Sequence, residues 1–209
     1  MEQVFVFLDE IGAAVCHRLP ERSFFWGGRQ MPLCARCTGL YTGAFFASCF
    51  FFWKGRQKGE KPFSTAAMLL TACALLPIAA DGFCSYIGLW ESSQFLRVLT
   101  GAAAGAATPG LFLLAGNFDP VQEPVRPIYE NTKELPVLLA AALLWGLALW
   151  LGLPVFAAGA VMSAAGVACF WTGVGYVLLH GLLPRKSLPF WRLSAGLAAV
   201  FLWLLRAVQ

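Results

Sequence analysis

Six long apolar stretches limit what this chain can fold into more than any other feature of its sequence. A helix needs about 20 apolar residues to cross the hydrocarbon core of a bilayer, and only helices and closed barrels satisfy their backbone polar groups there. Asp, Glu, Lys and Arg make up 12% of the chain, whereas a soluble domain carries roughly a quarter. The sequence therefore predicts an all-α, polytopic transmembrane helix bundle.

We expect one integral membrane domain over residues 1–209. The apolar stretch 3–15 is too short to span, so residues 1–36 are expected to form a short N-terminal interfacial helix and a Cys/His loop. Pro32 suits the first turn of the helix that follows this loop. The spanning helices are then expected at 33–53, 65–80, 93–117, 137–151, 155–182 and 190–205.

Basic residues are divided unevenly between the two ends of the expected bundle. Nine fall on one side, namely Lys54, Arg56, Lys58, Lys61, Arg126, Lys133, Arg185, Lys186 and Arg192. Six fall on the other, namely Arg18, Arg22, Arg29, Arg36, Arg97 and Arg206. Because cytoplasmic loops carry an excess of Lys and Arg, the Cys/His segment is expected on the non-cytoplasmic side. The basic residues form no continuous patch, which argues against nucleic acid as a partner.

Two pairs of glycines have the spacing of close helix contacts. Gly39 and Gly43 are four residues apart, as are Gly101 and Gly105. Small residues at this spacing let two helix backbones approach each other in lipid. We interpret both pairs as packing positions.

Reactive side chains gather between residues 16 and 37. Cys34 and Cys37 lie three apart at the expected start of a helix, which places both sulfurs on one face. The helix N-terminus also favours the thiolate form. With Cys16 and His17 these cysteines supply four ligands, the number that a closed zinc site requires. The sequence therefore predicts a metal site for zinc, with iron as the alternative, on Cys16, His17, Cys34 and Cys37.

The order of these four residues leaves two alternatives open. Cys16 and His17 are adjacent, and neighbouring side chains usually diverge, so one of them can fail to bind the metal and leave a position for water or substrate. In an oxidising compartment the same cysteines can instead form a structural disulfide or exchange thiols. Other cysteines are interpreted as small core residues (Cys49, Cys73 and Cys169) or as part of an outer turn (Cys84).

Charged residues near the expected outer face suggest a second feature. Arg97 falls about one turn into the third span, and a charge within hydrocarbon usually has a partner or a wet cavity. Asp81, at the expected end of the preceding span, is the natural partner. One interpretation is a salt bridge that joins two helices. The other is a polar cavity for an anionic substrate, bound by Arg18, Arg22, Glu91 and Arg97.

Two motifs resemble a known family. "CHRLPERSF" and "PLCARCTGLYTG" are similar to the signature of domain of unknown function 2085, a group of prokaryotic multi-pass membrane proteins. "DGF" and "WESSQFLRVLTG" resemble its second motif, with Trp90, Ser93 and Gln94 in place of an arginine, a threonine and an asparagine. The resemblance covers roughly residues 10–115. It implies a protein of the prokaryotic cell (inner) membrane, whose Cys/His and Asp/Arg residues belong to one site.

The sequence is compatible with three functions. A membrane metalloprotein would use zinc at the outer face, with Glu21 or Asp81 as general base toward an anionic or lipid substrate. A thiol–disulfide oxidoreductase would cycle Cys34 and Cys37 between dithiol and disulfide. A small transporter would use broken helices, and Pro109–Gly110 is expected to break the third span.

Overall fold

The computed structural model describes residues 2–119, 121, 123–182 and 190–208. In this part of the chain the predicted all-α fold is confirmed, with one short antiparallel hairpin added to seven α-helices. The elements in chain order are α1 (Glu2–Val15), η1 (Pro20–Arg22), β1 (Ser23–Trp26), β2 (Arg29–Cys34), α2 (Ala35–Trp53), α3 (Thr65–Tyr86), α4 (Gln94–Asn117), α5 (Glu134–Trp150), α6 (Phe156–Leu182) and α7 (Phe190–Val208).

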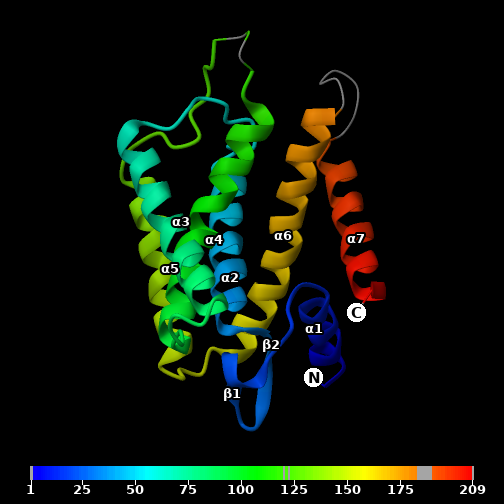
Figure 1. Ribbon diagram of the computed structural model, residues 1–209. Helices are drawn as coiled ribbons and strands as arrows, with labels where there is room; N and C mark the ends of the chain where they lie inside the picture. Colours follow the sequence, from blue (N-terminus) through cyan, green and yellow to red (C-terminus); the bar gives the residue numbers. More distant parts are fainter. Residues whose placement is uncertain (1, 120, 122, 183–189, 209) are drawn as a thin grey trace.

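Helix α2 is the central element of the bundle, and it packs most extensively against α4 and then against α6 (Figure 1). Helices α2 and α4 touch each other through their backbones. A Cβ atom at Gly39 would lie 2.8 Å from the amide nitrogen of Ala102, and one at Gly105 would lie 3.0 Å from that of Ala44. The predicted packing role of these glycines is therefore confirmed, because no side chain fits between the two helices.

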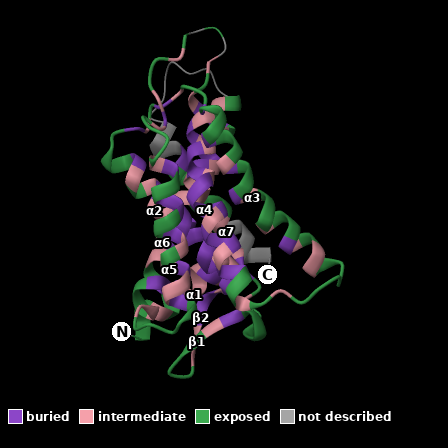
Figure 2. Cartoon of the chain, turned by 90° about the vertical axis from the view of Figure 1, so that its left-hand side faces the viewer, coloured by how far each residue is buried: buried purple, intermediate pink, exposed green. Residues whose placement is uncertain are grey.

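In the described part of the chain, three helices are long and apolar enough to cross a membrane, namely α3, α4 and α6. Helix α5 and the segment Ser194–Trp203 of α7 are apolar but shorter. Helix α3 carries exposed apolar side chains on its outer side, including Met68, Leu76 and Phe83, and Figure 2 shows this side of the bundle largely exposed. A continuous apolar surface of this kind suits lipid. The number of six spans stays a prediction.

The segment between α1 and α2 corrects the expected boundaries. Pro32 lies in β2 and not in a helix, because Phe25 pairs with Gln30 and Trp26 with Arg29 to form a hairpin. Gly27 and Gly28 have φ angles of +56° and +78°, which a tight two-residue hairpin turn requires. The expected loop is thus an ordered hairpin, and α2 begins only at Ala35.

Helices α3 and α4 also differ from expectation. Helix α3 continues to Tyr86, so Asp81 lies inside the helix and not at its end. Helix α4 runs through Pro109 without interruption to Asn117, so the break expected at Pro109–Gly110 is wrong. Proline is tolerated in such helices because neighbouring groups satisfy the freed backbone. This removes the feature that favoured a transporter.

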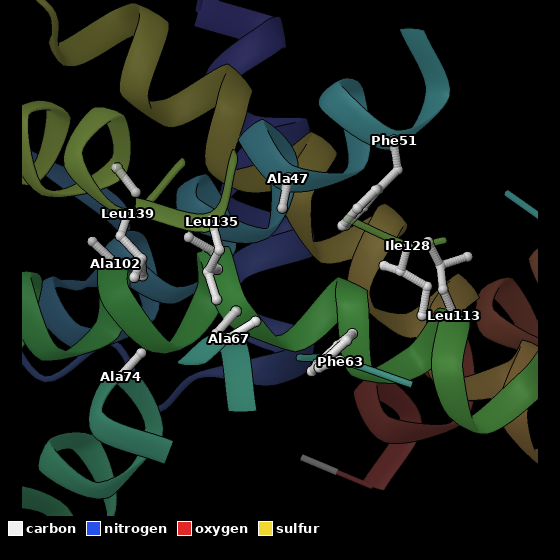
Figure 3. Packing of buried hydrophobic residues seen from close by; sticks show 13 residues of the cluster. Ala47, Phe51, Phe63, Ala67, Ala74, Ala102, Leu113, Ile128, Leu135 and Leu139 are labelled. Atoms are coloured by element: carbon white, nitrogen blue, oxygen red, sulfur yellow. The ribbon is translucent and has the colours of Figure 1, made fainter. Parts of the chain in front are cut away.

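Loop side chains close the bundle at the end away from the hairpin. Phe63 and Ile128, both from loops, pack with Phe51 and Leu113 in the main hydrophobic core (Figure 3). Nearby, the buried guanidinium of Arg56 donates two hydrogen bonds to Glu134, at 2.9 and 3.1 Å, and one to the carbonyl of Ile128 at 3.0 Å. The α2–α3 and α4–α5 connections therefore share one end of the bundle (Figure 1). Arg185 and Lys186, also predicted for this end, lie outside the described residues.

Candidate metal centre

Three cysteines from three different segments meet at one point. Cys16 directly follows α1, Cys34 ends β2, and Cys37 lies in the first turn of α2. Their sulfur atoms all lie within 4.8 Å of one another. Three of the four predicted metal ligands are thus brought together.

The hairpin and α1 together place Cys16 against Cys34. Helix α1 rests directly on the backbone of β2, since a Cβ atom at Gly12 would lie 2.8 Å from the carbonyl carbon of Pro32. The amide of Cys16 still donates to the carbonyl of Gly12 at 3.0 Å, so Cys16 continues the last turn of α1. The close approach at Gly12 therefore fixes the distance between Cys16 and the end of β2.

Two backbone amides donate hydrogen bonds to the sulfur of Cys16. They belong to Arg18 and Cys34, each 3.4 Å from the sulfur. Hydrogen bonds from the thiols of Cys34 and Cys37, together with these amides, hold the pKa of Cys16 well below its usual range. Donors that favour the charged form act in this direction. Cys16 is therefore prepared as a thiolate, the form that binds metals.

The turn after Cys16 has a strained residue at its centre. Arg18 has a φ of +50°, a left-handed conformation that is uncommon outside glycine. The turn is held by Gln30, which donates to the carbonyl of Arg18 at 2.6 Å, and by Asp9, which accepts from the Arg18 guanidinium at 2.8 Å. This conformation directs the amide of Arg18 back onto the sulfur of Cys16.

Apolar side chains enclose the three sulfurs on one side. Leu33, Tyr41 and Val167 are buried against Cys16, and Trp171 packs at their edge. Cys16 itself is 7% exposed, whereas Cys34 and Cys37 are half-buried. The centre is therefore sheltered but retains a side from which a small molecule can approach.

The other predicted site residues of this segment lie outside the cluster. His17 is exposed, and its ring nitrogens are not among the ligand atoms that gather here in the described part of the chain. Glu21 and Arg22 are both exposed and pair with each other at 3.9 Å. Arg18 faces Asp9 instead of a cavity.

A buried ion pair lies on the other side of the first turn of α2. The guanidinium of Arg36 pairs with the carboxylate of Asp81, which is 2% exposed. The predicted partner of Asp81 was Arg97, and the structure corrects this, because Arg36 reaches Asp81 across Gly82. Sequence reasoning missed Arg36 as a site residue, although its position between Cys34 and Cys37 was a usable signal.

Arg97 is held by neutral groups. Its guanidinium donates to the carbonyl of Ser92 at 3.0 Å and to the hydroxyl of Ser85 at 3.4 Å, and it is 6% exposed. Among the described residues it takes part in no ion pair. Glu91, predicted to act beside it, is exposed. Arg97 is therefore a buried positive charge without a direct counter-charge.

Comparison with known proteins gives consistent results. A family model described as "Predicted membrane protein (DUF2085)" matches residues 16–110. An uncharacterized protein of Methanothermobacter thermautotrophicus is 38% identical over 91 residues, which are 44% of this chain and 78% of that protein. An uncharacterized protein of Methanocaldococcus jannaschii is 37% identical over 103 residues, 49% of this chain and 64% of that protein. No solved structure matches significantly.

Proposed function

The chain belongs to the family of membrane proteins with domain of unknown function 2085, and from this premise we propose that it is an integral membrane metalloprotein. The metal ion is held by Cys16, Cys34 and Cys37, and zinc is the ion proposed. The observation that carries the proposal is the convergence of three sulfurs within 4.8 Å.

The arrangement of the sulfurs supports a metal more than a disulfide. Two sulfurs on a tetrahedral zinc ion lie roughly 3.8 Å apart, given a Zn–S distance of about 2.3 Å. The three sulfurs lie within 4.8 Å of one another, so small side-chain movements would bring them to this separation. A disulfide joins two sulfurs and leaves the third without a role. The two amides on Cys16 also match the hydrogen bonds that tune metal-bound thiolates.

The fourth position of the metal distinguishes a structural from a reactive centre. His17 follows Cys16 directly, but its exposure favours a centre of three thiolates with an open position. Three protein ligands and an open position are the arrangement of catalytic zinc. We propose that water or substrate binds there, with Asp81 or Glu21 as the proton acceptor.

The proposed substrate is an anionic or lipid molecule. Arg36 pairs with Asp81 and Arg22 with Glu21, whereas Arg97 is buried and takes part in no ion pair among the described residues. Arg97 is therefore the charge on this side of the bundle that an anionic group could neutralise. An anionic group bound at the metal would therefore be favoured by neighbouring arginines.

A second function is favoured by the hydrogen bonds to Cys16. A stabilised thiolate beside two further thiols is also the arrangement of a thiol–disulfide oxidoreductase. In that alternative Cys34 and Cys37 form the reducible disulfide. The two functions differ in whether purified protein contains a metal.

Elemental mass spectrometry on detergent-purified full-length protein tests the proposal. We expect about one zinc ion per chain, lost in Cys16→Ser, Cys34→Ser and Cys37→Ser. Cys84→Ser is the matched control, because Cys84 is half-buried on α3 and lies outside the cluster. His17→Ala should retain zinc if the fourth position is open, and should bind zinc more weakly than the wild-type protein if His17 is a ligand. Metal-free protein with a Cys34–Cys37 disulfide would contradict the metal centre and support the oxidoreductase.

A further inference from the structure

A groove of 860 Å³ lies between α2, α4 and α6 at the far end of α2 from the cysteines. It is lined from all three helices, by Cys49 and Phe52 of α2, Pro109 and Phe112 of α4, and Cys169 and Thr172 of α6. Cys49 follows Cys37 by twelve residues, which is about 18 Å along a helix. The groove is therefore a separate feature from the metal centre.

The walls and the rim of the groove differ in polarity. The walls are mostly apolar or aromatic, as at Phe52, Phe112 and Leu113. The rim is formed by Gly55, Gln57 and Lys58 from the loop after α2. A volume of this size is typical of a pocket for one ligand molecule. The polarity indicates a ligand with a long apolar part and a polar end.

The end of α2 marks the level of the membrane interface. Trp53 is 84% exposed there and is followed directly by Lys54. Aromatic side chains next to lysines are typical of the headgroup level. The rim of the groove thus lies among headgroups, and its walls extend into the hydrocarbon.

The rim of the groove carries a positive charge that no carboxylate neutralises in the described part of the chain. Arg56 is neutralised by Glu130 and Glu134. Lys58 is exposed and takes part in no ion pair among the described residues. Lys54 contacts the ring of Trp53 but no carboxylate in that part of the chain. A molecule whose polar end carries a negative charge therefore complements the rim.

We propose that this groove binds one membrane lipid with an anionic headgroup. An acyl chain lies between Phe52, Phe112 and Cys169, and the headgroup phosphate pairs with Lys58. The lipid comes from the surrounding bilayer, because Cys49 and Phe52 in the walls of the groove are exposed on the surface of the helices, where lipid would cover them. This proposal is independent of the metal centre at the other end of α2.

Native mass spectrometry on detergent-purified full-length protein tests it, with dioleoyl phosphatidylglycerol as the anionic probe and dioleoyl phosphatidylcholine as the comparison. We expect one tightly retained phosphatidylglycerol per chain and at least fivefold weaker binding of phosphatidylcholine. Cys49→Trp fills the groove and should weaken phosphatidylglycerol binding at least tenfold. Cys73→Trp is its control, because Cys73 is exposed on α3 and does not line the groove.

A second pair of variants tests the headgroup. Lys58→Glu should remove the preference for phosphatidylglycerol, whereas Lys133→Glu, the same change on an exposed lysine outside the groove, should retain it. Lys58 lies on a loop, so this variant tests the proposal even if Cys49→Trp does not fold. Equal binding of the two lipids by the wild-type protein would overturn the proposal. Unchanged phosphatidylglycerol binding in Cys49→Trp and Lys58→Glu would do the same.

Discussion

Asp81 of α3 pairs with Arg36, the residue that directly precedes Cys37 of the cysteine cluster. The pair joins α3 to the first turn of α2, with its carboxylate buried and its guanidinium half-buried. One oxygen of Asp81 has no hydrogen-bond partner among the described residues. The carboxylate is therefore held by one charged partner, and its loss would leave Arg36 uncompensated.

We expect Asp81→Asn to destabilise the protein strongly. Removing one partner of a fully buried ion pair costs about 3–5 kcal/mol, because the other charge stays buried and unpaired. We expect the lower end of this range, because the remaining Arg36 is half-buried. Thermal unfolding of detergent-purified protein measures the effect. Glu91→Gln, which changes an exposed carboxylate at the same end, should leave the midpoint unchanged. Equal midpoints for the two variants would contradict the structural role of the pair.

Glycine-to-alanine substitutions at two helix positions should change the free energy of unfolding in opposite directions. Gly105→Ala places a methyl group against the backbone of α2 and should destabilise the bundle. Gly181→Ala meets nothing within 4 Å and should stabilise α6 by about 0.5–1 kcal/mol, since alanine favours helix over glycine. Chemical denaturation in detergent compares the two. A stabilising Gly105→Ala would show that α2 and α4 do not touch through their backbones.

At position 18 glycine should be better tolerated than alanine. Both changes lose the ion pair with Asp9, but only glycine adopts the φ of +50° without strain. We expect Arg18→Gly to exceed Arg18→Ala in stability by about 1 kcal/mol. Zinc affinity, measured by competition with a chelator, should follow the same order, because this turn supplies an amide to Cys16. The reverse order would exclude a left-handed turn here.

The loops at the opposite end depend on Glu134. Glu134→Gln weakens both hydrogen bonds to the buried Arg56 and should lower the free energy of unfolding by about 1.5–3 kcal/mol. The charge of Arg56 keeps Glu130 as a partner in this variant. Glu123→Gln changes an exposed carboxylate on the same connection and is the matched control. Limited proteolysis between α4 and α5 should accelerate only in Glu134→Gln. Unaltered cleavage in that variant would show that the pairing of Arg56 with Glu134 does not hold this connection in place.

Stability of the metal-free protein should rise with pH between 6 and 8. The pKa of Cys16 is lowered in the folded chain, so the unfolded chain binds more protons in this range. The contribution of Cys16 is complete above the unfolded pKa of about 8.5 and is lost as the pH falls toward the folded pKa. Above pH 8.5 the raised pKa values of Cys34 and Cys37 act in the opposite direction, so the rise ends there. The comparison is wild-type protein in chelator against Cys16→Ser. A slope that persists in the variant would assign the effect to another group.

Much of the helical framework could be predicted, because long apolar runs and glycine spacing are local signals. Gly39 and Gly105 show this, since a spacing of four residues was enough to predict a contact between backbones. The cysteine cluster was also predicted in outline, because Cys34 and Cys37 lie three residues apart at the start of a helix. The packing of α1 on β2, and not local spacing, brings Cys16 to them, and His17 stays exposed.

Other features depend on contacts between distant segments. Asp81 was assigned to Arg97 because the two lie on successive helices, but α2 and α3 both pack against α4, and this brings Arg36 to Asp81 instead. The hairpin was missed because Pro32 resembles a helix start when it is considered without its pairing strand. The groove beside Cys49 was not predicted either, since it arises only where α2, α4 and α6 meet.

One wall of the cysteine cluster comes from a part of the chain that is synthesised much later than the cluster itself. Cys16, Cys34 and Cys37 lie within one short stretch, whereas Val167 and Trp171, which pack beside them, follow Cys37 by 130 and 134 positions. At roughly 5–20 residues per second, a ribosome needs on the order of ten seconds to add that distance. During this interval that side of the three thiols is uncovered, so the proposed capture of a metal ion would compete with their oxidation.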